Sequence, residues 1–176
     1  MLNKDSQLWQ YLSSGQRELV QQGFYLLEDF KAHVPAFAVT DYSFLIFPFA
    51  KAYEGFLKQL FLDMGFIKTW QYESDHLRIG KILSPGLVRM LRGRSVYGQL
   101  VQLDGGKELA DRLWQVWKKG RNRVFHYFPH NLAAVTFADA EQTISEIIKV
   151  MEEAIGLYNK RQNHHENNQQ VYVGES

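Results

Sequence analysis

Hydrophobic residues recur with the spacing of an α-helix over most of the chain. Large apolar side chains stand three or four positions apart, which places them on one face of each helix. Between residues 42 and 66 the apolar residues are so dense that we expect a helix buried on most sides. The stretches with this pattern are 16–33, 42–66, 107–120 and 139–158, preceded by a short leading helix. The pattern predicts an all-α fold.

Glycine and proline residues indicate where these helices end. Pro35 ends the first helix, and Gly65 is a stop signal for the second. Pro48, inside the second stretch, predicts a kink or a helix start just before it. Asp139 followed by Gln142 is typical of a helix cap. Four to five main helices are therefore expected.

Two segments do not follow the helical pattern. Residues 68–106 contain repeated Gly and Pro residues, so we expect a short irregular insertion with one or two short helices and an extended piece near residues 97–103. Residues 161–176 are rich in Asn, Gln, His and Glu, which is typical of a disordered tail. One helical domain is expected over residues 1–160, followed by this polar tail.

Composition narrows the class of protein. The 176 residues suit one domain, and 45% hydrophobic with 22% charged residues is typical of a globular chain. The net charge of +1 provides no overall attraction to nucleic acids or membranes. The chain has no Cys, which excludes disulfides and zinc–cysteine sites, and it has no apolar run of bilayer length. We expect a soluble, cytoplasmic protein without a membrane partner.

A basic segment at the end of the third long helix carries the clearest chemical signal. Four cations fall within six residues with no acid among them, and an aromatic pair follows. Cations pair with phosphates and aromatic rings stack on bases, so this composition suits single-stranded nucleic acid. The residues expected to contact RNA are Lys118, Lys119, Arg123 and Tyr127. The alternative interpretation is that the cations only offset the helix dipole.

Within this segment, Arg121 and His126 stand five residues apart, with Asn122 directly after the Arg. Arg neutralises phosphate oxygens and His moves protons near neutral pH, so the pair can act on an RNA phosphate without a metal. Five residues correspond to about 140° of rotation on an ideal helix. The two side chains therefore converge only if the helix ends or bends between them, or if a second subunit contributes another copy. Gly120 and Pro129 favour a bend.

A second group of charges interrupts the apolar helix over residues 42–66. Lys51 and Glu54 are one turn apart and share a face, and Lys58 follows Glu54 by four residues. These residues form either a weak surface ion pair or the polar lining of a cleft or interface. His126 and His130 have metal-ligand spacing, but Pro129 lies between them, so we expect no metal and no cofactor.

The order of helices, together with Arg121-Asn122 and His126, resembles the HEPN superfamily. The hallmark of that superfamily is an Arg followed four to six residues later by His, with a polar residue after the Arg. The segment 41–58 looks like the HEPN domain of RNase LS-type toxins, which carry a basic residue and a Glu one turn apart. Lys51 and Glu54 match those positions, with Lys where the family has Arg. The similarity covers residues 16–160 and implies a HEPN-type up-and-down helical bundle.

This resemblance implies a metal-independent endoribonuclease that works as a homodimer. His126 would be the general base or acid, Arg121 would stabilise charge on the phosphate, and Asn122 would orient the pair. Lys51 and Glu54 would complete the polar site. The RNA 2′-hydroxyl would attack the neighbouring phosphate and leave a 2′,3′-cyclic phosphate. The implied setting is a bacterial toxin–antitoxin or phage-defence system, with a protein antitoxin covering the site.

Two alternatives stay open. The first is a non-catalytic HEPN-like module for dimerisation or partner binding, which the Lys at position 51 and the near-neutral net charge favour. The second retains catalysis but pairs with a nucleotidyltransferase antitoxin encoded nearby. The first alternative predicts that His126→Ala and the wild type do not differ in RNA cleavage.

Overall fold

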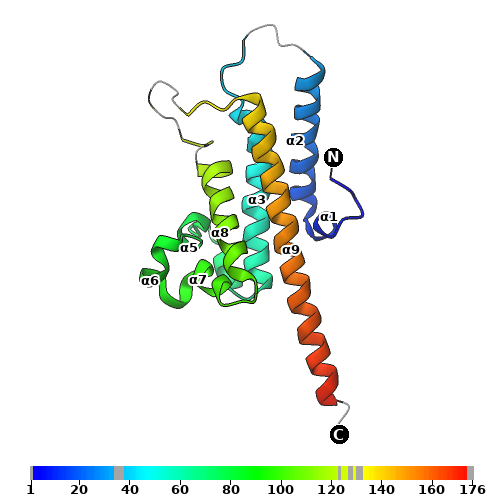
Figure 1. Cartoon of the computed structure of the whole chain (residues 1–176), viewed down its shortest axis with the longest axis vertical. Coiled ribbons are helices and arrows are strands. Elements are labelled where there is room, and N and C mark those ends of the chain that lie inside the picture. The colour runs from blue at the N-terminus through cyan, green and yellow to red at the C-terminus, as the bar shows by residue number, and fades with distance from the viewer. Residues whose placement is uncertain (1, 34–37, 123, 127–128, 130–132, 174–176) are drawn as a thin grey trace.

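The computed structural model describes residues 2–33, 38–122, 124–126, 129 and 133–173, with side chains through residue 163. Within these ranges every regular element is a helix, which confirms the predicted all-α class. The bundle is built from α2, α3, α8 and α9, with the short α1 against α9 (Figure 1). Their bounds are α1 Gln7–Tyr11, α2 Ser14–Ala32, α3 Ser43–Asp63, α8 Gly106–Trp117 and α9 Phe137–Val173.

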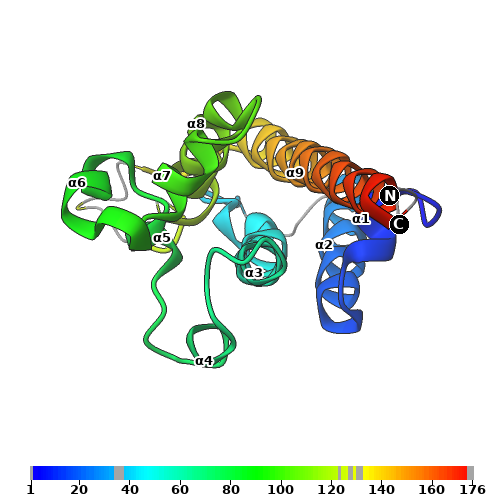
Figure 2. The ribbon, with the colours of Figure 1, turned by 90° about the horizontal axis from the view of Figure 1, so that it is seen from below.

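Helix α3 is the centre of the bundle, as its dense apolar sequence predicts. Eleven of its 21 residues are buried, and α2 and α9 both pack against it. Seen along the bundle, α3 lies between α2 and the segment that carries α5 to α7 (Figure 2). The helix runs through Pro48 from a start at Ser43, and Gly65 follows its end with a positive φ of 73°. The predicted stop is confirmed.

Tyr53, in the middle of α3, ties this helix to α8. The side chain is fully buried, and its hydroxyl donates a hydrogen bond of 3.0 Å to the carbonyl oxygen of Leu113. Burial raises the pKa of Tyr53 well above its ordinary value, because the charged phenolate is poorly solvated there. Tyr53 is therefore a permanent neutral donor, which holds the two helices in a defined register.

The segment between α3 and α8 contains only short helical pieces, joined by turns and loops. The extended strand-like piece expected near residues 97–103 is wrong: residues 96–101 form α7 instead. Ser95 begins that helix, since its side chain accepts a hydrogen bond from the Gly98 amide at 3.0 Å. The pieces are α4 Thr69–Tyr72, α5 Ile79–Ile82, η1 Pro85–Leu87, α6 Val88–Leu91, η2 Arg92–Arg94 and α7 Val96–Val101.

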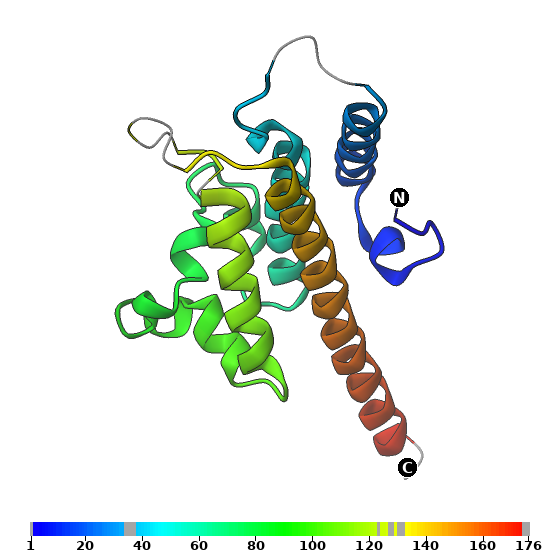
Figure 3. The same ribbon diagram turned by 45° about the horizontal axis from the view of Figure 1, so that its top comes forward.

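Helix α9 differs from the prediction at both ends. Thr136, rather than Asp139, caps its start: the Thr136 hydroxyl accepts from the Asp139 amide at 3.1 Å and donates to the Asp139 carboxylate. The backbone is helical to Val173, well past residue 158 where the apolar pattern ends, and the disorder expected for residues 161–176 stays a prediction. Residues 157–173 contain no Gly or Pro, so the sequence there does not oppose a helix. Figures 1 and 3 show this part projecting beyond the other helices.

Candidate functional site

The chain around Arg121 leaves the regular α-helix. After α8 the backbone widens into a turn of π-helix, η3 Lys118–Asn122. Such wide turns are rare and occur frequently at functional sites. Gly120 is buried here against α9, and a Cβ atom at this position would lie only 3.0 Å from Cδ1 of Ile147. The glycine therefore allows the end of α8 to pack closely on α9, and the predicted break in the helix is found.

Arg121 extends from this turn toward α3. Its Nε lies 3.5 Å from Oε2 of Glu54, and both side chains are about one third exposed, at 33% and 32%. The guanidinium carbon is 5.4 Å from the ring centroid of Trp117 and 5.3 Å from that of Phe125. An Arg between two aromatic faces is held by cation–π attraction as well as by the ion pair. The arrangement fixes the position of the cation.

The Arg121 side chain nevertheless keeps hydrogen-bonding capacity. Its Nε faces Glu54 and is buried without a hydrogen bond in the part of the chain that the structure describes, so an anion would bind through the terminal Nη groups. Its contact with Glu54 is an ion pair at the long end of the range. A guanidinium has five N–H donors in a fixed plane, which match two oxygens of a phosphate. Arg121 is thus positioned by its neighbours and still able to bind an anion.

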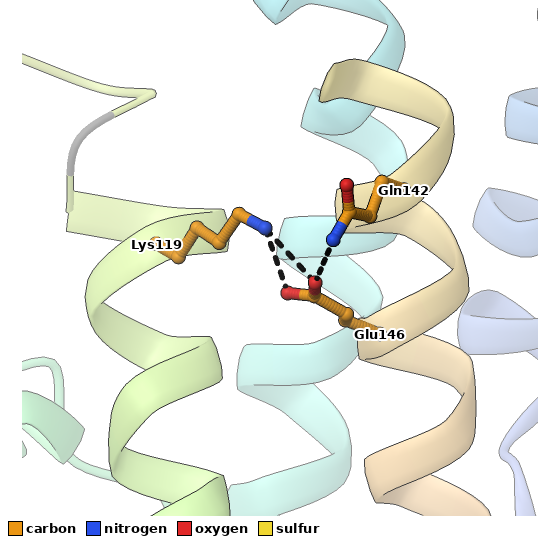
Figure 4. A network of polar contacts seen from close by, with 3 residues as sticks. All are labelled: Lys119, Gln142 and Glu146. Atoms are coloured by element: carbon orange, nitrogen blue, oxygen red, sulfur yellow. Dashed lines mark hydrogen bonds and ion pairs between the residues drawn. The ribbon is translucent and has the colours of Figure 1, made fainter. Parts of the chain in front are cut away.

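The neighbouring cation Lys119 is fully engaged. Its Nζ lies 2.9 and 3.0 Å from the two carboxylate oxygens of Glu146 on α9, and Gln142 donates to the same carboxylate at 2.9 Å (Figure 4). Lys118 is exposed. The segment has no acid in its own sequence, but α3 and α9 supply one carboxylate each. The RNA-binding role predicted for Lys118 and Lys119 stays a prediction; of these two residues, Lys119 is the one paired with a carboxylate.

Some of the other predicted site residues are solvent-exposed or half-buried, and the rest lie outside the residues that the structure describes. Lys51 is exposed on α3, one turn before Glu54, and pairs with no carboxylate among the described residues. His126 is exposed just past η3, where the Phe125 amide still donates to the Arg121 carbonyl at 3.2 Å. Asn122 is half-buried. Arg123, Tyr127 and His130 lie outside the described residues.

The structure therefore brings two of the five predicted catalytic residues into contact. Arg121 and Glu54 meet although they are far apart in the sequence, whereas Lys51 and Glu54 share only a helix face. His126 forms no hydrogen bond or ion pair with either of them in the described part of the chain. The side-chain pairing was not predictable from local spacing, because it depends on how α8 packs beside α3.

Sequence reasoning missed the aromatic side chains that surround Arg121. Trp117 and Phe125 precede and follow it by four residues, and the Phe125 ring contacts Phe47 of α3 at 5.1 Å. The signal was available: an aromatic residue four positions away on each side of an Arg stacks on it whenever the segment is helical. The contact with Phe47 had no sequence signal.

The rest of the described molecule offers no comparable cluster. A groove of about 900 Å³ lies between the first half of α8 and α9, lined in part by Leu109, Arg112, Glu153 and Leu157, at the opposite end of α8 from Arg121. Arg112 and Glu153 pair with each other at its edge. Among the described residues, no three His, Asp or Glu side chains gather as metal ligands, and no helix has the length and apolarity needed to cross a membrane.

Comparison with known proteins assigns no relative to this chain. No protein-family model matches it, and no curated protein or solved structure does so either.

Proposed function

We propose that this protein is a metal-independent endoribonuclease of the HEPN type. The observation that supports it most is the ion pair between Arg121 Nε and Glu54 Oε2, 3.5 Å apart. Arg121 belongs to the predicted motif and lies on the π-helical turn η3. The two residues come from separate helices and are the ones that the resemblance places in one polar site. A one-third exposed ion pair, with an exposed His five residues after Arg121 and an exposed Lys three residues before Glu54, supplies the groups needed for phosphate chemistry.

The proposed reaction is a transesterification within the RNA strand. His126 removes the proton from a ribose 2′-hydroxyl, whose oxygen attacks the adjacent phosphorus. Arg121 donates to the phosphate oxygens, where negative charge builds up in the transition state. The bond to the 5′-oxygen breaks, and that oxygen takes up a proton. The products are a 2′,3′-cyclic phosphate and a 5′-hydroxyl, with no metal in any step.

The remaining predicted residues have supporting roles in this proposal. Asn122 orients the Arg121 and His126 pair through hydrogen bonds, and Lys51 adds a cation to the phosphate site. Glu54 positions Arg121 through the ion pair. The active form is a homodimer, and a protein antitoxin controls it in the cell. The setting is a bacterial toxin–antitoxin or phage-defence system.

A non-catalytic partner-binding module is the rival function. The observation in its favour is that Arg121 is already satisfied in part by Glu54 and two aromatic rings. A cation held in this way can be purely structural. Under this reading the exposed His126 has no chemical role.

Incubation with total RNA in excess EDTA separates the two functions. The wild-type protein, His126→Ala and the control His76→Ala, which changes another exposed His, are compared. Cleavage by the wild type and the control but not by His126→Ala, with cyclic phosphate ends, supports the nuclease. Equal cleavage by all three removes His126 from the mechanism, and no cleavage by any of them favours the binding module. Growth arrest on expression, relieved by His126→Ala, is the corresponding cellular test.

A further inference from the structure

Two exposed phenyl rings, one from α3 and one from the turn after η3, contact each other near Arg121. Phe47 of α3 is 48% exposed and Phe125, just past η3, is 39% exposed, yet their ring centroids are only 5.1 Å apart with planes at 35°. Large apolar side chains that contact each other usually bury their contact surface. Neighbouring rings left open to solvent are typical of a binding surface.

The position of Phe47 on α3 is informative because that helix is almost entirely covered. Along α3 only Phe44, Phe47, Lys51 and Asp63 are exposed. Phe47, Lys51 and Glu54 follow each other at helical spacing, so they form one open stripe. This stripe leads from the aromatic pair through a free cation to the carboxylate that holds Arg121.

We propose that Phe47 and Phe125 form a platform on which one base of single-stranded RNA stacks, next to the phosphate that Arg121 binds. The inference rests on the proposed function and adds the contact that selects an unpaired strand. The Arg121 guanidinium lies over the Phe125 ring, 5.3 Å from its centroid, so the cation covers part of that ring and the open face of Phe47 is the surface left for the base. Stacking on aromatic side chains requires a base that is not already paired within a duplex.

The charges around the platform favour RNA over an apolar protein surface. Lys51 is exposed one turn after Phe47 on α3, and Lys118 and His126 are exposed on the segment that leads to and follows Phe125. Glu54 of α3 pairs with Arg121, and Glu146 of α9 pairs with Lys119. An apolar partner would remove water from these cations without pairing them, which is unfavourable. A nucleotide covers the rings with its base and pairs the cations with its phosphates.

Binding of uncleavable RNA tests the platform without requiring catalysis. The first probe is a fluorescein-labelled mixed-sequence 12-mer with 2′-O-methyl sugars throughout, which has no attacking hydroxyl. The second has the same length and phosphates but abasic sugars. Fluorescence anisotropy with the full-length protein gives the Kd for each probe. The ratio of the two Kd values isolates the contribution of the bases.

Three variants complete the experiment. Phe47→Leu and Phe125→Leu keep an apolar side chain but remove the aromatic face. Phe44→Leu is the control: Phe44 is on the same helix and 42% exposed, but its ring packs on Phe30 and Tyr42. We expect each platform variant to weaken binding of the base-bearing RNA roughly 5- to 150-fold, the range for loss of one stacked base. The Kd for the abasic probe should stay the same in every variant. Phe44→Leu should bind both probes with the Kd of the wild type.

The outcomes distinguish this inference from the proposed function. The platform is overturned, even if total RNA is cleaved, if the wild type binds both probes with the same Kd. It is also overturned if Phe47→Leu and Phe44→Leu weaken binding of the base-bearing RNA equally. Selective loss in the platform variants supports it even if no RNA is cleaved, in which case the catalytic proposal alone fails. If the wild type binds neither probe and Phe47→Leu changes only self-association in sedimentation, the rings belong to a contact between copies and the inference is wrong.

Discussion

Lys119 and Arg121 stand two residues apart on the same π-helical turn, and their surroundings differ. Lys119 points to α9, where both carboxylate oxygens of Glu146 lie within 3.0 Å and Gln142 supports that carboxylate. Arg121 points to α3, where Glu54 is 3.5 Å away and aromatic rings flank the guanidinium. The first cation is used in joining two helices. The second is positioned but retains donors for a ligand.

The comparison shows that local basic charge is a poor guide to which cation binds a substrate. In the sequence the two residues belong to one acid-free basic run. In the structure their availability depends on the distance and number of the carboxylate contacts. Of these two cations, Arg121 has the weaker carboxylate contact, and an exposed His126 follows it in the chain.

The largest expected contrast is between conservative changes at the two cations. Arg121→Lys retains the charge but loses the planar fork, so we expect RNA cleavage to slow roughly 10²- to 10³-fold, as for loss of a transition-state donor. Lys119→Arg should change the cleavage rate little, because Arg keeps the positive charge and can still pair with Glu146. Single-turnover cleavage of total RNA in EDTA measures both. Similar losses in the two variants would contradict the division of roles.

The matched carboxylates give the next contrast. Glu54→Gln keeps the shape of the side chain but removes the charge that positions Arg121, so we expect cleavage to fall by up to about 100-fold. Glu146→Gln should leave cleavage unchanged while weakening the α8–α9 contact. Circular dichroism checks that both variants fold. If Glu146→Gln slows cleavage as much as Glu54→Gln, the two ion pairs are not functionally distinct.

Gly120 lies between the two cations and tests the packing that separates them. Gly120→Ala would place Cβ 3.0 Å from Cδ1 of Ile147, so we expect the free energy of unfolding to fall by about 1–3 kcal/mol. Gly156 lies on α9, and no neighbouring side chain or other element comes within 4 Å of a Cβ added there. Gly156→Ala should therefore raise the free energy of unfolding by up to about 1 kcal/mol through helix propensity. Urea unfolding measures both. Equal stability of the two variants would show that α8 and α9 do not approach closely at Gly120.

The smallest effect is expected from removing the Lys119 charge alone. Lys119 and Glu146 are 41% and 34% exposed, so solvent screens their attraction. Lys119→Met should lower the free energy of unfolding by only about 0–1 kcal/mol, and the difference should shrink at high salt. A loss well above this range would make the pair a main stabilising contact rather than a weak tether.

The sequence by itself determined the helical class and most helix positions. Helical spacing of apolar residues is a local property, so α2, α3, α8 and the first half of α9 were predictable within a few residues. The π-helical turn lies at the break signalled by Gly120. The extended piece expected at residues 97–103 was wrong, because glycines were taken as breaks where the Ser95 cap and the buried side chains of Val96, Tyr97 and Leu100 stabilise a helix.

Only the tertiary structure decided which side chains meet. The motif named Arg121 and His126, and the earlier helix named Lys51 and Glu54, but no spacing predicted that Glu54 pairs with Arg121 rather than with a lysine on its own helix. The contact between Phe47 and Phe125 is equally non-local. Periodicity describes faces of single helices, whereas pairs across helices depend on the rotation and separation that core packing sets. In this protein those are set by the buried face of α3 and by the close approach at Gly120.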